Sequence, residues 1–250
     1  MFKALTKITL SLSFFMVSGV TFAADYCHKD SGYADSYVLA LSSQAGFCQT
    51  YGYDAGKKEC QEMTQNSPYL YQFTLHGLWP NQDACGTNYG FCNTKKQRNF
   101  CDYESLNLST KTADALKAVM PSYNYGTCLA RYEWNKHGSC QALNQDDYFG
   151  VAIDLVSQIN SSNFGLYFKK HVGQTISLHE LESAFDQSFG SNMHQKLYLN
   201  CKQGVLVDLY IELPLFDAHS SLDLKQLLPM APDAKKDHCP SNFKLSDFHV

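Results

Sequence analysis

The feature that most constrains this chain is its ten cysteines, which lie between Cys27 and Cys239 of a 250-residue sequence. An even and dense set of cysteines is unusual for a cytosolic enzyme and typical of proteins exported to an oxidising compartment. We therefore expect up to five disulfide bonds. Zinc binding is the rival use of cysteine, but the sequence has no Cys-x-x-Cys pair and no His-Glu-x-x-His motif.

The N-terminal segment predicts the same compartment. Lys3 and Lys7 precede a mostly apolar stretch, 8–20, and small residues follow before Ala24. This order indicates a secretory signal peptide over residues 1–23, cleaved after Ala23. A membrane anchor is the alternative, but a spanning helix needs roughly 20 apolar residues. We expect a mature chain of residues 24–250 in the periplasm or medium, with no membrane attachment after cleavage.

Composition excludes several classes of protein. Lys and Arg total 20 against 24 Asp and Glu, a net charge of −4, and removal of Lys3 and Lys7 leaves 18 against 24, or −6. A broad cationic surface for nucleic acid is therefore excluded, although a local cationic site is not. Aromatic residues make up 14% of the chain, which excludes disorder. The length fits one domain with one sizeable core.

Hydrophobic periodicity predicts a mixture of helices and strands. Alternating or buried apolar runs indicate strands, and stripes at helical spacing indicate helices. Ser177-Leu178-His179-Glu180 reads as a capping box that opens a helix. The predicted strands are 37–41, 69–76, 196–200 and 205–213, the last two forming an antiparallel hairpin, and the other predicted helices are 110–120, 127–137 and 146–159. Without a strand–helix–strand rhythm, the class is α+β with an antiparallel sheet flanked by helices.

Two short stretches carry the candidate chemistry, 73–80 and 133–140. In the second, Glu133 and His137 share a helix face and Lys136 is close to both in sequence, so all three head groups can reach one spot. A carboxylate, a cation and an imidazole gathered there suit acid–base work on an anionic centre. The same spacing also fits an exposed ion pair on a helix face, with Lys136 free in water.

His76, in the first stretch, is by itself no stronger a candidate than a hydrogen-bonded structural histidine. The pair with His137 changes this. Cleavage of a phosphodiester through an internal hydroxyl needs a base and an acid on opposite sides of phosphorus. Two imidazoles with pKa values near 6.5 can play both roles near neutral pH.

These stretches resemble the two active-site segments of the ribonuclease T2 family, the secreted acid ribonucleases. His76 to Pro80 matches the His-Gly-Leu-Trp-Pro pattern, and Glu133 to Cys140 matches Glu-Trp-x-Lys-His-Gly-x-Cys. The resemblance implies a ribonuclease T2-like fold and an endonuclease for single-stranded RNA that uses no metal and no other cofactor. It implies 2′,3′-cyclic phosphates as first products, later opened to 3′-phosphates.

The resemblance also assigns roles to single residues. His137 would take the proton from the ribose 2′-OH, and His76 would protonate the departing 5′-oxygen. Lys136 and Glu133 would stabilise the pentacoordinate phosphorane. A reaction that needs the 2′-OH as nucleophile explains selectivity for RNA over DNA.

The same likeness points to substrate-binding residues. Trp79 resembles the family's base-stacking residue, with a core tryptophan as the alternative, and Tyr89 is a weaker candidate for the same pocket. Stacking tolerates any base, so we expect low base specificity. Asn81 stands where many relatives have Asp at a position tied to base preference. Tyr132 stands where some relatives have a phosphate-contacting His, and would offer a neutral hydroxyl.

The family pattern also bears on the cysteines. It makes Cys140 a disulfide partner, and Cys101 best resembles its mate. We expect Cys201 with Cys239 to close the C-terminal region. The pairing of the other six stays open, since six cysteines allow 15 combinations: Cys27, Cys48, Cys60, Cys85, Cys92 and Cys128.

Two other classes of function compete with the ribonuclease. One is a catalytically silent binding module of the same fold for RNA or a protein partner, against which the intact His76, Glu133, Lys136 and His137 argue. The other is a metal-dependent phosphodiesterase, which EDTA would inhibit. The acidic net charge favours an enzyme that binds few nucleotides at a time over a protein that forms a stable complex with RNA. We expect RNA as the substrate and a monomeric protein.

Overall fold

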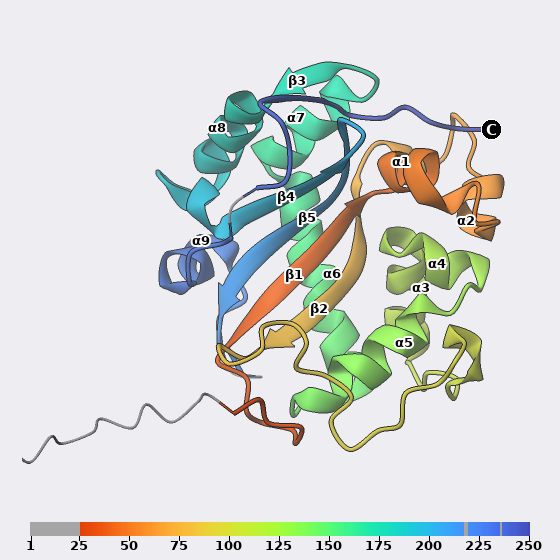
Figure 1. Ribbon diagram of the computed structural model, residues 1–250, viewed down its shortest axis with the longest axis vertical. Helices are drawn as coiled ribbons and strands as arrows, with labels where there is room; N and C mark the ends of the chain where they lie inside the picture. Colours follow the sequence, from red (N-terminus) through yellow and green to blue (C-terminus); the bar gives the residue numbers. More distant parts are fainter. Residues whose placement is uncertain (1–25, 218–219, 236) are drawn as a thin grey trace, which may run out of the picture.

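The computed structural model describes residues 26–217, 220–235 and 237–250, so the predicted signal peptide lies outside the described residues. The fold is built on a mainly antiparallel sheet (Figure 1). Its central strand β1 (Ser36–Ser43) pairs with β2 (Phe73–Asn81) on one side and β5 (Val205–Pro214) on the other. Strand β4 (Leu197–Lys202) pairs with β5, and the short β3 (Thr175–Ser177) and β6 (Asn242–Lys244) extend the sheet.

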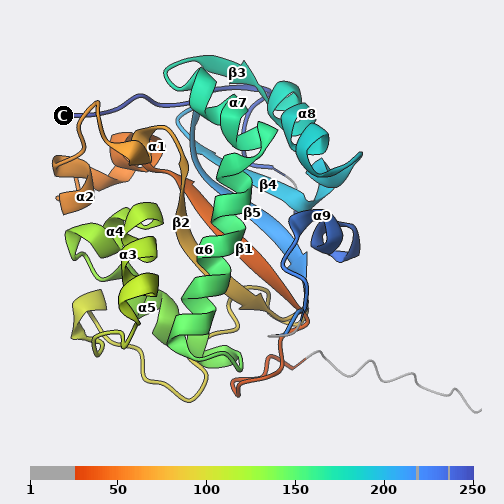
Figure 2. The same cartoon turned by 180° about the vertical axis from the view of Figure 1, so that it is seen from behind.

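Helices cover one face of this sheet. Figure 2 shows α6 (Gln145–Ser161) crossing the back of β1 and β2, with α7 (Asn163–His171) and α8 (Leu178–Phe189) above it. Every second residue of the strands points into this layer, because side chains alternate along a strand. The core between sheet and helices includes Leu39, Leu41, Phe73, Leu75, Leu209, Ile211, Phe149, Val156, Phe164 and Phe185, each buried.

The opposite face of the sheet is only partly covered. Around its edge lie α1 (Gln44–Phe47) and α2 (Lys58–Gln61), and to the side of β2 lie three further helices (Figure 1). These are α3 (Thr110–Val119), α4 (Pro121–Tyr125) and α5 (Leu129–Lys136). The short α9 (Leu224–Leu227) lies beyond β5. The face between these elements is left to polar and aromatic side chains from the strands.

The structure confirms the α+β class and most predicted elements. The strand at 37–41, the helices at 110–120 and 146–159, the hairpin and the capping box of Ser177 with Glu180 are all present. The strand predicted over 69–76 is wrong at both ends. Pro68–Leu70 forms a 3₁₀ turn, since proline fixes its φ near −65°, and the strand instead runs from Phe73 through the Gly-Leu-Trp-Pro motif.

All ten cysteines are paired, which gives the five disulfides expected. The pairs are Cys27–Cys85, Cys48–Cys60, Cys92–Cys140, Cys101–Cys128 and Cys201–Cys239. The predicted Cys201–Cys239 bond is confirmed.

The predicted pairing of Cys101 with Cys140 is wrong. Cys128 and Cys140 lie at opposite ends of α5, whose eight residues span about 12 Å. Cys101 lies at the Cys128 end and pairs there. The loop after β2 runs past the other end, where the Phe91 amide donates to the Lys136 carbonyl at 2.7 Å, and brings Cys92 to Cys140.

Within the described ranges, no helix is long and apolar enough to cross a membrane.

Candidate active site

A β-bulge in β2 places His76. Ala40 pairs with Gly77 and the next residue, Leu41, pairs with Leu75, so His76 is an extra residue without a partner on β1. Bulges of this kind re-aim a side chain and are common beside active sites. Leu75 and Leu78 both point into the core although they are three residues apart, and the bulge absorbs this change of phase. His76 therefore projects from the open face, with 31% of its side chain exposed.

Glu133 reaches this face from α5. Its Oε2 accepts a hydrogen bond from Trp79 Nε1 at 2.6 Å, and its Oε1 lies 3.8 Å from His76 Nε2. The side chain is buried, and burial raises the pKa of its carboxyl, although the nearby His76 and the Trp79 hydrogen bond partly offset this. The carboxylate that joins the two sequence motifs is therefore held in a dry environment, where its charge acts strongly on neighbouring groups.

His137 lies directly after α5 and has no exposed surface. Its ring stacks on the Trp79 indole with centroids 5.1 Å apart, and neither ring nitrogen has a hydrogen-bond partner. Burial lowers the pKa of His137 well below its ordinary value, and the charges of Lys136 and His76 lower it further. His137 is thus held as a neutral imidazole, the protonation state that a general base requires.

Lys136 is the cation of this group. Burial lowers the pKa of its ammonium, and Glu133 partly restores it. Its Nζ lies 5.7 Å from the centroid of the Tyr132 ring, a cation–π distance, and Tyr132 in turn stacks on Phe100. Of the four residues predicted to be catalytic, His76 and Glu133 lie 3.8 Å apart, and the charges of Glu133 and His76 act on Lys136 and His137, respectively.

One residue of this group was not found by sequence reasoning. Asp208 of β5 lies with its Oδ1 3.8 Å from His76 Nδ1, and the same oxygen accepts a hydrogen bond from Ser42 at 2.7 Å. The signal was present in the predicted strand. Leu209, Ile211 and Leu213 point into the core, so Asp208, which alternates with them, lies on the opposite face of the sheet.

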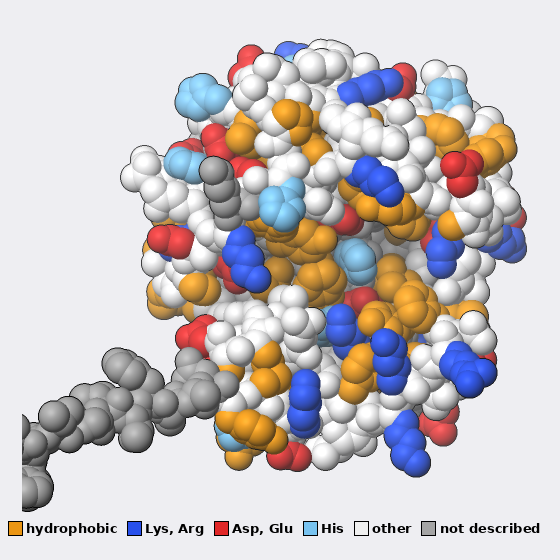
Figure 3. Space-filling view, in the orientation of Figure 1, with side chains coloured by type: hydrophobic (Ala, Val, Ile, Leu, Met, Phe, Trp, Pro, Cys, Tyr) orange, Lys and Arg blue, Asp and Glu red, His pale blue; other side chains and the backbone are white. Residues whose placement is uncertain are grey.

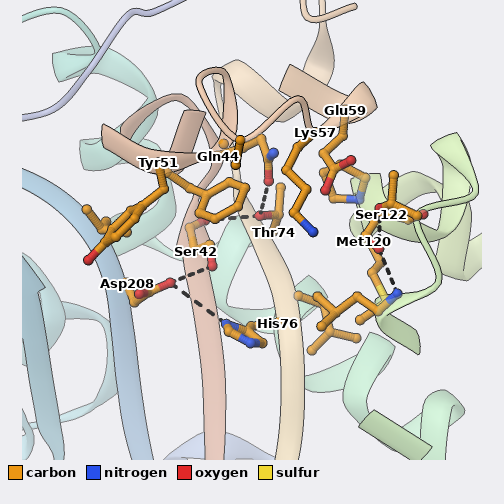
Figure 4. A pocket seen from close by; sticks show the side chains of 18 of the residues that line it. Ser42, Gln44, Tyr51, Lys57, Glu59, Thr74, His76, Met120, Ser122 and Asp208 are labelled. Carbon is orange, nitrogen blue, oxygen red and sulfur yellow. Dashed lines mark hydrogen bonds and ion pairs between the residues drawn. The ribbon is translucent and has the colours of Figure 1, made fainter. Parts of the chain in front are cut away.

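Two cavities flank His76 and Trp79. The first, of about 410 Å³, opens on the His76 and Asp208 side beneath α1 and α2 (Figure 4). Its walls are mainly apolar, with Phe47, Tyr51, Phe100, Met120 and Leu129 among the lining residues. Glu59 also lines it, buried and with Oε2 unpaired. A flat aromatic ring with polar edges matches such a lining.

The second cavity, of about 470 Å³, lies beyond Trp79 along β4 and β5. Trp79, Tyr210 and Tyr198 form its aromatic wall, with centroids 5.5 Å and 5.3 Å apart in that order. Asn81 lines it and donates to Ser36 Oγ at 3.0 Å. Burial raises the pKa of Glu212 in the same wall to about 7, against the opposing charge of Lys235.

Tyr89 does not join this wall. It is fully buried, and its hydroxyl donates to the Asp30 carbonyl at 2.6 Å and lies 3.2 Å from the Cys140 carbonyl. Its ring packs against the Cys92–Cys140 disulfide and has no face open to a base. Tyr198 and Tyr210, which sequence reasoning missed, occupy the place beside Trp79 that was expected for Tyr89.

Figure 3 shows the site as a hollow in the molecular surface, with histidine and hydrophobic side chains at its centre and several lysine or arginine side chains around it. The arrangement offers two imidazoles, a buried carboxylate and an ammonium, between a mainly apolar cavity and a second cavity of mixed polar and aromatic lining. It can move protons at an anionic centre. Among the described residues, no group of three or more His, Cys, Asp or Glu side chains is placed to hold a metal ion.

Comparison with known proteins gives concordant results. The model of the Ribonuclease T2 family matches residues 34–222. Ribonuclease I of Escherichia coli (strain K12) is 30% identical over 223 residues, which cover 80% of this chain and 83% of that protein. Ribonuclease 1 of Arabidopsis thaliana is 26% identical over 75% of this chain and 77% of its own.

Solved structures show the same fold. A mutant of RNase MC1 in complex with 5′-UMP superposes with a TM-score of 0.54 at 19% identity, over 85% of this chain and 99% of that one. The self-incompatibility-associated SF11-RNase of Nicotiana alata gives a TM-score of 0.53 at 19% identity, over 82% of this chain and 95% of its own.

Proposed function

The chain belongs to the ribonuclease T2 family and is an endoribonuclease, and we propose that it cleaves single-stranded RNA by a metal-independent, two-histidine mechanism. The observation that carries the proposal is the convergence of His76, Glu133, Lys136 and His137 from two distant segments on one open sheet face.

The first step forms a cyclic product. Neutral His137 takes the proton of the ribose 2′-OH, whose oxygen attacks phosphorus, and charged His76 gives its proton to the departing 5′-oxygen. Lys136 and Glu133 act on the phosphorane between them, Lys136 through its charge. The product is a 2′,3′-cyclic phosphate. Water then opens it to a 3′-phosphate with the two histidines in exchanged roles.

His137 must become accessible for this reaction. In the structure it lies beneath the Trp79 indole, which Glu133 holds by a hydrogen bond. We infer that the ribose displaces the indole when RNA binds and that Trp79 then stacks on a base. Catalytic contacts often form only in the substrate complex, so the resting geometry is compatible with His137 as the base.

The two cavities are proposed to hold the nucleotides on either side of the scissile phosphate. Trp79 and Asn81 line one, and their stacking and amide groups favour low base specificity. We further propose that residues 1–23 are a signal peptide, that residues 24–250 form one catalytic domain, and that the enzyme acts as a monomer in the periplasm or medium. The five disulfides support an oxidising compartment.

The test is RNA hydrolysis by the purified mature chain in excess EDTA, beside His76→Ala and His137→Ala. We expect fragments with cyclic-phosphate ends from the wild type, and a loss of at least about 10²-fold in each variant, the usual size of a general acid–base contribution. A folded but inert wild type would favour the silent binding module. Activity that EDTA abolishes would refute the mechanism.

A further inference from the structure

Asp208 faces the ring edge of His76 opposite to the one that faces Glu133. His76 Nε2 lies toward Glu133 at 3.8 Å, and Nδ1 lies toward Asp208, also at 3.8 Å. The two carboxylates therefore flank the ring, one at each nitrogen (Figure 4 shows the Asp208 side). Both nitrogens can donate only when the ring is charged, so this arrangement favours the imidazolium.

A hydrogen bond from the neighbouring strand β1 fixes the Asp208 carboxylate. Ser42 lies opposite it on β1, and the Ser42 hydroxyl donates to Asp208 Oδ1 at 2.7 Å. Only 14% of the Asp208 side chain is exposed. Burial opposes ionisation of this carboxyl, but His76 and Ser42 together outweigh burial and hold its pKa below the ordinary value. The group is therefore a carboxylate at any pH at which His76 titrates.

We propose that Asp208 is the positioning residue of the general acid: it holds the Nδ1 edge of the His76 imidazolium and keeps Nε2 turned toward Glu133, Lys136 and His137. This inference rests on the proposed function. In the cleavage step the Nε2–H bond breaks, the proton passes to the 5′-oxygen and the ring becomes neutral. Asp208 keeps its charge and takes no proton.

The charges around His76 act in both directions. Burial lowers its pKa, while Asp208 from β5 and Glu133 from α5 raise it and Lys136 from α5 lowers it; the balance lies above the ordinary value. His137 also lies near, but as a neutral ring. Of the two carboxylates, Asp208 lies outside the group that faces the phosphate, so its charge can be removed without altering the phosphate-facing residues.

A purely structural role for Asp208 is the alternative, because its bond to Ser42 also joins β5 to β1. Asp208→Asn separates the two roles. The amide keeps the shape and an oxygen for Ser42, and it loses only the charge. A structural defect would lower activity equally at all pH values, whereas loss of the charge must alter the pH at which His76 gives up its proton.

The experiment measures kcat/KM for a dinucleotide against pH, together with an NMR titration of the histidine ring protons, assigned with His76→Ala. We expect Asp208→Asn to move the alkaline limb and the His76 titration to lower pH by about 1 unit, as for loss of an opposite charge at this distance. Asp208→Glu should restore much of the shift. Ser42→Ala should move both in the same direction by less.

Asp186→Asn is the matched control, because Asp186 forms a similar pair with His194, 2.8 Å apart, on α8. It should leave the His76 titration and the alkaline limb unchanged. The inference would be overturned if the NMR titration of His76 did not shift in Asp208→Asn. It would also be overturned if that titration shifted while the alkaline limb of the kcat/KM–pH profile stayed in place. A wild type that cleaves no RNA would refute only the proposed function, because the NMR titration still decides whether Asp208 sets the charge of His76.

Discussion

At the scale of single residues, the surroundings of the two histidines shift their pKa values in opposite directions. Two flanking carboxylates favour the charged form of His76, whereas complete burial favours the neutral form of His137. A charged acid and a neutral base coexist between the lowered pKa of His137 and the raised pKa of His76. The proposed reaction should therefore run between these two pKa values, and its kcat/KM should fall as the pH rises above the His76 pKa.

The neutral state of His137 has a cost for stability that can be measured. Both of its ring nitrogens are buried and unpaired, and an unpaired buried polar group costs about 1–3 kcal/mol. His137→Leu has a similar volume and removes both nitrogens. We expect it to raise the free energy of unfolding by about 1 kcal/mol, a rise in Tm of about 2–4 °C for a chain of this size, while abolishing RNA cleavage.

The pH dependence of this gain has a definite sign. The folded state lowers the pKa of His137, so below about pH 6.5 the unfolded chain binds a proton that the folded chain does not. The wild type therefore loses stability as the pH falls. The difference in the free energy of unfolding between His137→Leu and the wild type should increase from pH 7 to pH 5. Thermal melts at both pH values check this. If His137→Leu were less stable than the wild type at both pH values, the buried imidazole of His137 would carry no net cost for stability.

At the scale of elements, the bulge in β2 brings the two motifs together and depends on a glycine. Gly77 follows His76 at the bulge, and a Cβ there would overlap Glu133 Oε2 and Trp79 Nε1. The hydrogen bond between those two groups passes over the bare backbone of Gly77. The Gly of the His-Gly-Leu-Trp-Pro motif is thus explained by the close approach of the Glu133 carboxylate.

Gly77→Ala should accordingly damage catalysis more than folding. Glu133 and Trp79 must both shift, and a displacement of about 1 Å at a catalytic group can cost 10²-fold in rate. We expect kcat to fall by about 10–100-fold. Gly150→Ala, in α6, is the control, since a Cβ there meets no atom within 4 Å; it should leave kcat unchanged and add about 1 kcal/mol of stability. Equal kcat values for both variants would contradict this account of the bulge.

Local sequence pattern predicted the elements better than the contacts between them. Periodicity located β1, α3, α6 and the β4–β5 hairpin, because each buries a regular face. It could not show that Tyr89 would be buried against a disulfide or that Cys92 would reach Cys140, since both depend on the path of an irregular loop. Asp208 was missed for a related reason: its link to His76 spans three strands and exists only in the assembled sheet.

At the scale of the whole molecule, the sheet separates stability from function by face. The helix-covered face carries the core, and the open face carries His76 and Trp79 from β2 and Asp208 and Tyr210 from β5. The central strand contributes Val38, Ala40 and Ser42 to this face, and these side chains are shorter than those of His76, Trp79 and Tyr210, so a hollow forms between β2 and β5. The overall charge is −4, so local cations must hold the phosphates.

Lysines are available for this purpose at the edges of the hollow. Lys57 lines the first cavity and Lys235 the second, and Lys202 lies 3.5 Å from the centroid of the Tyr51 ring. We expect these lysines to contact phosphates of the bound RNA. A few contacts of this kind suit an enzyme that releases its product after every turnover, because tight binding of polyanions comes from neutralising many phosphates at once.

The division of the hollow into two cavities predicts a preference for unpaired RNA. If each cavity takes one base, both bases beside the scissile bond must leave any helix they belong to, at a cost of a few kcal/mol. A 20-mer annealed to its complement should therefore be cut about 10²–10³-fold more slowly than the same 20-mer alone. A duplex with two unpaired nucleotides at the cleavage position should regain most of the single-strand rate, because only those two bases need to enter the cavities. Gel analysis of end-labelled strands gives all three rates, and equal cleavage of duplex and single strand would show that the bases stay outside the cavities.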